Sequence, residues 1–115
     1  MSEKTHFDLE CFKSVISSLI RDLARKDYKK IETSGENGRI PIPELIERIN
    51  EYGEDIVPLP DNGFSEALCY NIAHKYLDVY IPIWTVSGKS DLTLSLKCWY
   101  EGGRPIVAIE DLEVL

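Results

Sequence analysis

The stretch LDVYIPIWTVSGKSDLTLSLKCWYEGGRPIVAIEDLEVL, residues 77–115, decides the fold of this chain. Apolar and polar residues alternate along it, as they do in β-strands whose two faces meet different surroundings. Two turn sequences, SGKSD at 87–91 and EGGR at 101–104, separate the alternating segments. The stretch therefore predicts an antiparallel meander, and its last strand should be bent or irregular near Glu110.

The alternation also assigns side chains to the two faces of the predicted sheet. One face collects the aliphatic residues Leu77, Val79, Ile81, Ile83, Leu92, Leu94, Leu96, Cys98 and Tyr100. The opposite face carries Tyr80, Pro82, Trp84, Thr93, Ser95, Lys97 and Trp99, with Val107 and Ile109 as further candidates. Because proline cannot donate a ladder hydrogen bond, its strand should lie at an edge or contain a bulge there.

Two helices are expected before the meander. Apolar residues recur every three or four positions between Asp8 and Lys26, the spacing of an amphipathic helix. A second helix, PELIERINEY at 43–52, has proline at its first position and Gly53 after its end. Between them, 32–43 is predicted to be a loop with a tight turn at Asn37-Gly38. The segment 65–76 could be strand or short helix, and strand is preferred.

These elements predict an α+β fold: two N-terminal helices packed on a curved antiparallel sheet of three to five strands, in a single domain spanning residues 1–115. The expected core consists of Phe12, Val15, Ile16, Leu19, Ile20, Leu23, Ile49, Leu77, Val79, Ile81, Leu92, Leu94 and Leu96. The aromatic residues of the second face leave three alternatives open. They line a pocket enclosed by the sheet, they meet a partner, or they are covered by a helix or by loop 54–66.

Charge narrows the possible partners. The chain has a net charge of −7, and residues 32–115 hold fifteen Asp and Glu against six Lys and Arg, a balance of −9. Such a surface repels nucleic-acid phosphates and attracts a basic partner, although acidity also simply keeps a small protein soluble. No apolar run approaches the roughly 20 residues of a membrane span. The polar N-terminus is unlike a signal peptide, so a cytoplasmic location is expected.

The sequence offers little for catalysis or metal binding. Three cysteines without CxxC spacing predict buried, reduced thiols at Cys11, Cys69 and Cys98. His74 and Asp78, four residues apart, are a weak candidate for a catalytic pair. Glu110, Asp111 and Glu113 lack the glycine-rich ligand loop of a cation site. We therefore expect no enzymatic activity, no catalytic or metal-ligating residues and no cofactor.

Several short motifs resemble a family of small bacterial domains. They are the strand end Trp84-Thr85, the hairpin return GKSDLTL at 88–94, the closing IEDLEVL at 109–115 and GRIPIPEL at 38–45. Such domains are similar to the immunity proteins of bacterial toxin systems, including contact-dependent growth inhibition. Their helix-then-sheet order also resembles the nuclear transport factor 2-like fold, although the Asp–His dyad of its enzymatic members is absent here.

The resemblance implies an immunity protein that binds and neutralises a cognate toxin C-terminal domain, a nuclease in the favoured interpretation, by occlusion. The alternative is a small NTF2-like ligand-binding protein or enzyme with an enclosed aromatic pocket, in which His74 or Asp78 would be the internal polar group. Asp91, after the SGKS turn, should be structural. The expected partner-binding residues are six acids and two aromatic anchors: Glu44, Glu47, Glu51, Glu54, Asp55, Asp61, Trp84 and Trp99.

Overall fold

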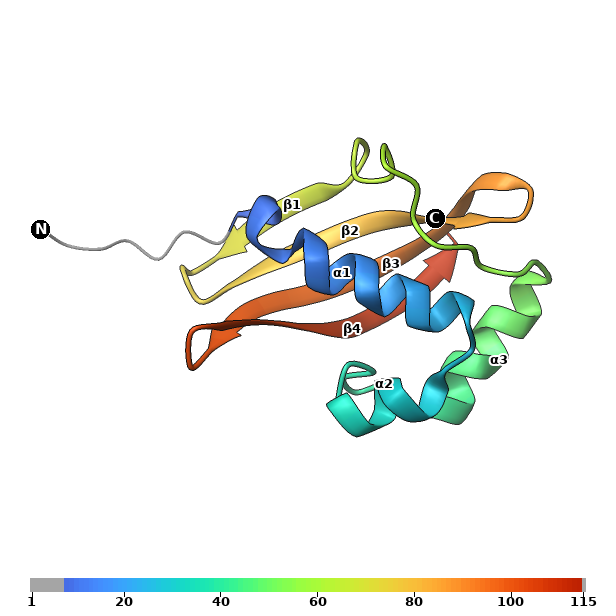
Figure 1. Ribbon diagram of the computed structural model, residues 1–115, viewed down its shortest axis with the longest axis horizontal. Helices are drawn as coiled ribbons and strands as arrows, with labels where there is room; N and C mark the ends of the chain where they lie inside the picture. Colours follow the sequence, from blue (N-terminus) through green and yellow to red (C-terminus); the bar gives the residue numbers. More distant parts are fainter. Residues whose placement is uncertain (1–7, 115) are drawn as a thin grey trace, which may run out of the picture.

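The computed structural model describes residues 8–114, so His6 and the rest of the polar N-terminal segment lie outside it. Within this range, three helices are followed by four antiparallel strands (Figure 1). They are α1 (Leu9–Ala24), α2 (Tyr28–Ser34), α3 (Ile42–Tyr52), β1 (Leu68–Ile72), β2 (Tyr76–Thr85), β3 (Gly88–Glu101) and β4 (Arg104–Val114). The predicted α+β class is confirmed, with one helix more than the sequence indicated. No described helix combines the length and apolarity that a membrane crossing requires.

Helix α1 begins where its sequence provides a cap. The Asp8 side chain accepts a hydrogen bond from the Glu10 amide at 3.3 Å, which satisfies one of the open amides of the first turn. The predicted apolar stripe is buried, apart from Val15, which is half-buried. The helix ends at Ala24, and Lys26 follows with φ +60°. The chain can therefore turn sharply into α2.

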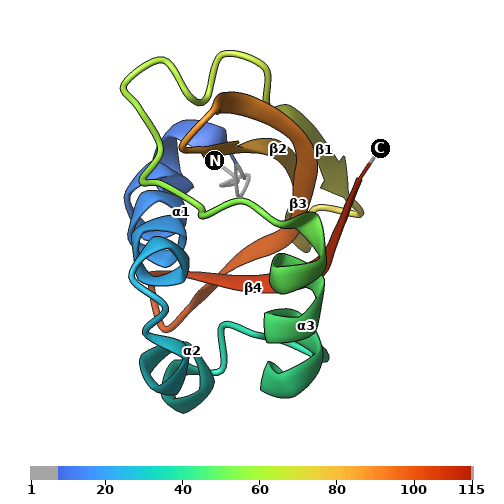
Figure 2. The same cartoon turned by 90° about the vertical axis from the view of Figure 1, so that its right-hand side faces the viewer.

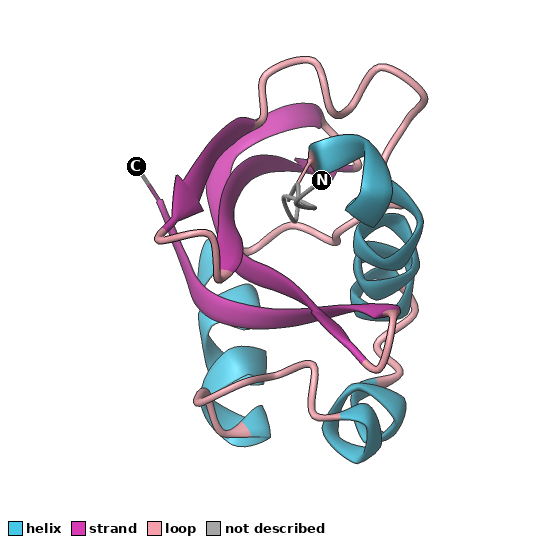
Figure 3. Ribbon diagram, turned by 90° about the vertical axis from the view of Figure 1, so that its left-hand side faces the viewer, coloured by secondary structure: helices cyan, strands magenta, loops and turns pink. Residues whose placement is uncertain are grey.

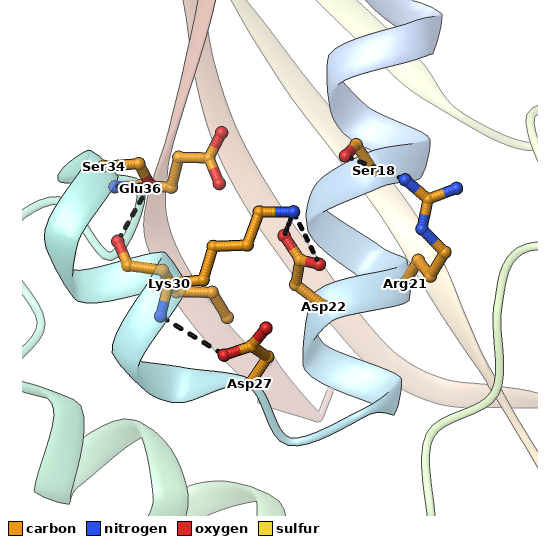
Figure 4. A network of polar contacts seen from close by, with 8 residues as sticks. Ser18, Arg21, Asp22, Asp27, Lys30, Ser34 and Glu36 are labelled. Atoms are coloured by element: carbon orange, nitrogen blue, oxygen red, sulfur yellow. Dashed lines mark hydrogen bonds and ion pairs between the residues drawn. The ribbon is translucent and has the colours of Figure 1, made fainter.

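Helix α2 corrects the expected loop. Asp27 caps its first turn through the Lys30 amide at 3.4 Å, and Gly35 ends it in the left-handed conformation. Figure 4 shows how its charged residues meet those of α1: the Lys30 ammonium lies 3.2 Å from the carboxylate of Asp22, whose side chain is only 3 % exposed. A buried carboxylate requires such a partner. This ion pair therefore ties the two helices together.

The four strands form a meander in the order β1-β2-β3-β4. Figures 2 and 3, which view the molecule from its two ends, show the sheet curving around α1. The core fills the space between them, and every predicted core residue except Val15 is buried. On the sheet, Val79 pairs with Leu96 and Leu96 pairs with Ile109, so the aliphatic residues of three strands meet on the concave face.

Val107 and Ile109 lie on this concave face. The prediction that they are candidates for the opposite face is therefore wrong. Both are 1 % exposed, and they pair with Cys98 and Leu96. The register of β3 and β4 shifts between Ser95 and Leu96, which leaves Glu110 as an extra residue in β4. This bulge reverses the alternation, so that Leu112 also faces the core. It is the irregularity predicted near Glu110.

Pro82 lies in a central strand, and the predicted bulge explains how it fits. The register of β2 and β3 shifts between Pro82 and Trp84. On the other side of β2, strand β1 begins only opposite Tyr80, where Leu68 is its partner. Pro82 thus lies beyond the end of β1, so its missing N–H costs no hydrogen bond between β1 and β2.

The loop after α2 closes the outer edge of β4. The amide of Ile109, in β4, donates to the carbonyl of Glu36 in this loop at 2.8 Å. The predicted tight turn at Asn37-Gly38 is present, and Gly38 has φ +60°. The turn follows helix α2 and joins no pair of strands. Its function is to bring the loop backbone against β4.

Candidate partner-binding surface

Helix α3 displays three of the predicted acids. Leu45 and Ile49 bury one side of this helix, which places Glu44, Glu47 and Glu51 in solvent on its other sides. The side-chain carboxylates of Glu47 and Glu51 make no hydrogen bond or ion pair with any other described residue. Their charges are consequently available to a partner.

Arg48 joins α3 to the last strand. Its guanidinium contacts the Asp111 carboxylate, donates to the Leu112 carbonyl at 3.1 Å and lies 2.6 Å from Glu44. These two carboxylates raise the pKa of Arg48. Partial burial works to raise the pKa of Asp111, but the hydrogen bonds from Arg48 and the Leu112 amide outweigh it and hold this pKa below its usual value. Glu44 is thus partly neutralised by its own helix.

The segment after α3 brings two further acids beside Trp84. The Val57 amide donates to the Trp84 carbonyl at 2.9 Å, and the Val86 amide donates to the Asp55 carbonyl at 3.1 Å. The Thr85 hydroxyl bonds the Glu54 carboxylate at 2.6 Å. The exposed Asp55 side chain pairs with Lys26 at 3.5 Å. The segment that carries Glu54 and Asp55 is therefore fixed against the end of β2 by backbone and side-chain hydrogen bonds.

Two hollows flank α3. One has a volume of about 250 Å³ and is lined by Arg48, Glu51, Tyr52, Leu92, Leu112, Glu113 and Val114. The other has a volume of about 190 Å³ and is lined by Leu23, Lys26, Ile49, Asn50, Gly53, Glu54, Asp55 and Ile56. The first hollow combines apolar side chains with Glu51 and Glu113, so it can receive the long side chain of Lys or Arg, whose stem is apolar.

The structure separates the remaining predicted residues from this cluster. Asp61 is exposed in the loop before β1, and its carboxylate makes no hydrogen bond or ion pair with another of the residues 8–114. Trp84 pairs with Lys89, whereas Trp99 lies ten residues further along β3, about 30 Å away at the rise of a strand. Trp99 lies on the convex face, 5.8 Å from the Lys97 ammonium. One surface patch therefore cannot contain both tryptophans and the helix α3 acids.

Neither tryptophan lies in an enclosed pocket. Both occupy the face of the sheet opposite the core, and both are half-buried. The concave face is filled by the side chains of α1 and of the strands. This arrangement gives no support to the alternative of an aromatic binding cavity inside the sheet.

Sequence reasoning did not identify Tyr52 as a partner of Asp91. The Tyr52 hydroxyl donates to the Asp91 carboxylate at 2.7 Å, joining the end of α3 to the start of β3. The neighbouring Ser90 hydroxyl accepts from the Leu92 amide at 3.1 Å, the backbone contact that had been expected of Asp91. Since the two partners are 39 residues apart, no local pattern could have shown their contact.

The groups that could support catalysis are dispersed. Cys98 is buried, as predicted, and burial raises its pKa to about 12, whereas Cys11 and Cys69 are exposed, contrary to expectation. His74 occupies the β1–β2 turn with φ +58°, while Asp78 lies within β2. Within residues 8–114, no three His, Cys, Asp or Glu side chains are grouped as metal ligands.

The fold and surface define a small α+β domain with an acidic helix beside an antiparallel meander. The family described as a domain of unknown function (DUF7668) matches residues 20–115, and the chain belongs to this family. No curated protein and no solved structure matches the chain.

Proposed function

We propose that this protein is an immunity protein, which binds a cognate toxin C-terminal domain in the bacterial cytoplasm and neutralises it by occlusion. The toxin domain belongs to a polymorphic toxin or contact-dependent growth inhibition system and is a nuclease. The observation that carries this proposal is the exposed acidic side of α3, where Glu47 and Glu51 have no partner of their own among the described residues.

The mechanism requires no reacting group in this protein. A nuclease domain presents cationic side chains where it holds phosphates. Carboxylates on a rigid helix can occupy that position, and complementary charges also accelerate the encounter. The larger of the two hollows beside α3 accepts the apolar stem of a Lys or Arg residue of the partner. Trp84 provides an apolar anchor, since Trp is enriched among binding hot spots.

The proposal is tested by co-expression with the toxin domain encoded by the adjacent gene, scored by cell survival and by co-purification. Wild-type protein should protect the cells and co-purify with the toxin. The double variant Glu47→Lys/Glu51→Lys should bind more slowly, with a defect that shrinks as salt rises. Glu44 and Asp55 are left unchanged, because their reversal would also break ion pairs within the protein.

The matched control is Glu32→Lys/Glu101→Lys. Both residues are exposed, Glu32 on α2 and Glu101 at the end of β3, and their reversal changes the net charge by the same amount. This control should protect the cells like the wild type. Equal protection by both folded double variants would exclude the α3 surface as the interface. Failure of the wild-type protein to bind any neighbouring gene product would overturn the immunity function itself.

A further inference from the structure

The two edges of the sheet are treated differently. At the β4 edge, the Ile109 amide is bonded to Glu36, Gly38 lies against the strand, and the bulge at Glu110 interrupts the ladder. Covering loops and bulges are the means by which proteins prevent unwanted pairing at a sheet edge. This edge is therefore closed to another strand.

Strand β1 at the other edge has no bulge in its ladder, and no strand or loop from the described residues 8–114 bonds to its outer side. In its sequence, LCYNI, there is no charged residue, proline or glycine, and its pairing with β2 has no register shift. Four of its five residues are exposed; Leu68 is 57 % and Tyr70 is 52 % exposed. Within residues 8–114, no strand pairs with the outer side of β1. An open apolar edge of this kind is a template for another strand.

We propose that β1 pairs antiparallel with β1 of a second copy of this chain, about a two-fold axis at Tyr70. In this register Leu68 faces Ile72, Cys69 faces Asn71, and Tyr70 faces its own copy. Side chains alternate along a strand, so every pair on the convex face is apolar or aromatic, and every pair on the other face joins Cys to Asn. The strand is thus complementary to itself, as a two-fold interface requires.

The surroundings of Tyr70 favour the same arrangement. Its ring meets the Tyr80 ring edge-on, with centroids 5.9 Å apart and an interplanar angle of 72°. This contact holds the Tyr70 ring on the convex face. Pairing at the axis would therefore build a row of four tyrosines across the dimer, and aromatic cross-strand pairs are among the stabilising ones.

The acids of α3 do not oppose this contact. Helix α3 and its acids lie beside β4, at the side of the sheet remote from β1 (Figure 1). Screening over about 8 Å at physiological ionic strength weakens repulsion between distant surfaces. The dimer is independent of the proposed immunity function, because its interface and the α3 surface lie at opposite edges of the sheet.

The interface is small. Five residues on each side fall short of the roughly 1,200 Å² that stable complexes bury. We therefore expect a weak, reversible dimer, visible by sedimentation as a concentration-dependent equilibrium. Tyr70→Lys places two cations opposite each other on the axis and should raise the dissociation constant at least about tenfold. Val86→Lys, at an exposed position in the β2–β3 turn, should leave the equilibrium unchanged.

A cysteine at position 70 tests the register. Directly opposed residues of antiparallel strands have Cα atoms about 4.5–5.5 Å apart, within the range of a disulfide. Under mild oxidation, Tyr70→Cys in a Cys11→Ser/Cys69→Ser background should give a covalent dimer, whereas Val86→Cys in the same background should not. A wild-type protein that remains monomeric at all concentrations would overturn the proposal. So would a dimer that the Tyr70→Cys substitution fails to cross-link, since its contact would then lie elsewhere.

Discussion

Gly38 lies directly against the backbone of Ile109: a Cβ atom at position 38 would stand 2.3 Å from the Ile109 carbonyl oxygen. Gly38 also has φ +60°, a conformation that side chains disfavour. Gly38→Ala therefore combines backbone strain with an overlap against a strand that cannot move easily. We expect it to lower the free energy of unfolding by about 2 kcal/mol or more, measured by urea denaturation.

Gly35→Ala separates the two causes. Gly35 has φ +79°, but nothing lies within 4 Å of a Cβ atom there. It should lose only the strain contribution, about 1 kcal/mol. Equal losses at both positions would show that the loop does not press against β4.

The ion pair between the first two helices predicts a second stability effect. Lys30→Met leaves the Asp22 carboxylate, only 3 % exposed, without its ammonium partner. An unsatisfied buried acceptor costs about 1–3 kcal/mol, so thermal unfolding should occur at a clearly lower temperature. Lys29→Met is the matched control, because this neighbouring exposed lysine makes no ion pair with a described residue. A similar loss in both variants would contradict a specific role for Lys30.

Asp91 should be a structural residue, and its partner provides the test. Asp91→Ala and Tyr52→Phe remove the same hydrogen bond, so each should cost about 0.5–1.5 kcal/mol. Asp91→Ala should also leave toxin binding by the folded protein intact. The double variant should lose less than the sum of the two single losses. Additive losses would mean that the two residues act separately. Loss of binding without loss of stability would assign Asp91 to the interface.

The meander could be predicted because its information is local. Alternation over 77–100 identified two strands and their buried faces, and both are confirmed. The phase of β4 could not be read in the same way. A bulged residue reverses the alternation, so Val107 and Leu112 both face the core although an odd number of positions separates them. Only the pairing with β3 shows which residue is extra.

The composition of the candidate surface was easier to predict than its geometry. The exposed acids on α3 follow from the helix and its apolar stripe. The Glu44–Arg48 pair is also local, because residues four apart are neighbours on a helix. That Asp55 has a cationic partner depends on Lys26, which only the folded chain places there. The distance between Trp84 and Trp99 likewise follows from strand pairing. Sequence reasoning grouped these residues by kind, whereas the fold groups them by position.

The pair Arg48–Asp111 predicts a pH dependence of stability. The folded pKa of Asp111 lies below its ordinary value of 3.8, so its stabilising contribution is present above that pH and is lost as pH falls through the folded value. The melting temperatures of Glu113→Gln and Glu113→Gln/Asp111→Asn should therefore differ at neutral pH, with the Asp111 form more stable, and converge in strong acid. Both variants carry Glu113→Gln, because a hydrogen bond with Asp111 raises the pKa of Glu113 and its titration would otherwise add to the pH dependence. A difference that persists unchanged in acid would contradict this assignment.

The β1–β2 turn predicts a gain in stability. Ala73 and His74 have φ +53° and +58°, and the Lys75 amide closes the turn on the Ile72 carbonyl at 2.8 Å. Two successive positive φ values are typical of the hairpin turn that prefers Asn-Gly, and each costs roughly 1–2 kcal/mol with an ordinary side chain. Ala73→Asn/His74→Gly should therefore raise the free energy of unfolding by about 1 kcal/mol, measured by urea denaturation, after the greater freedom of glycine in the unfolded chain is subtracted. Ser87 lies in the β2–β3 turn and has no positive φ, so Ser87→Gly relieves no strain. It should lower the free energy of unfolding, because glycine makes the unfolded chain more flexible. Opposite signs for the two substitutions to glycine would establish strain at Ala73 and His74, whereas a loss in both would show that the turn stores none.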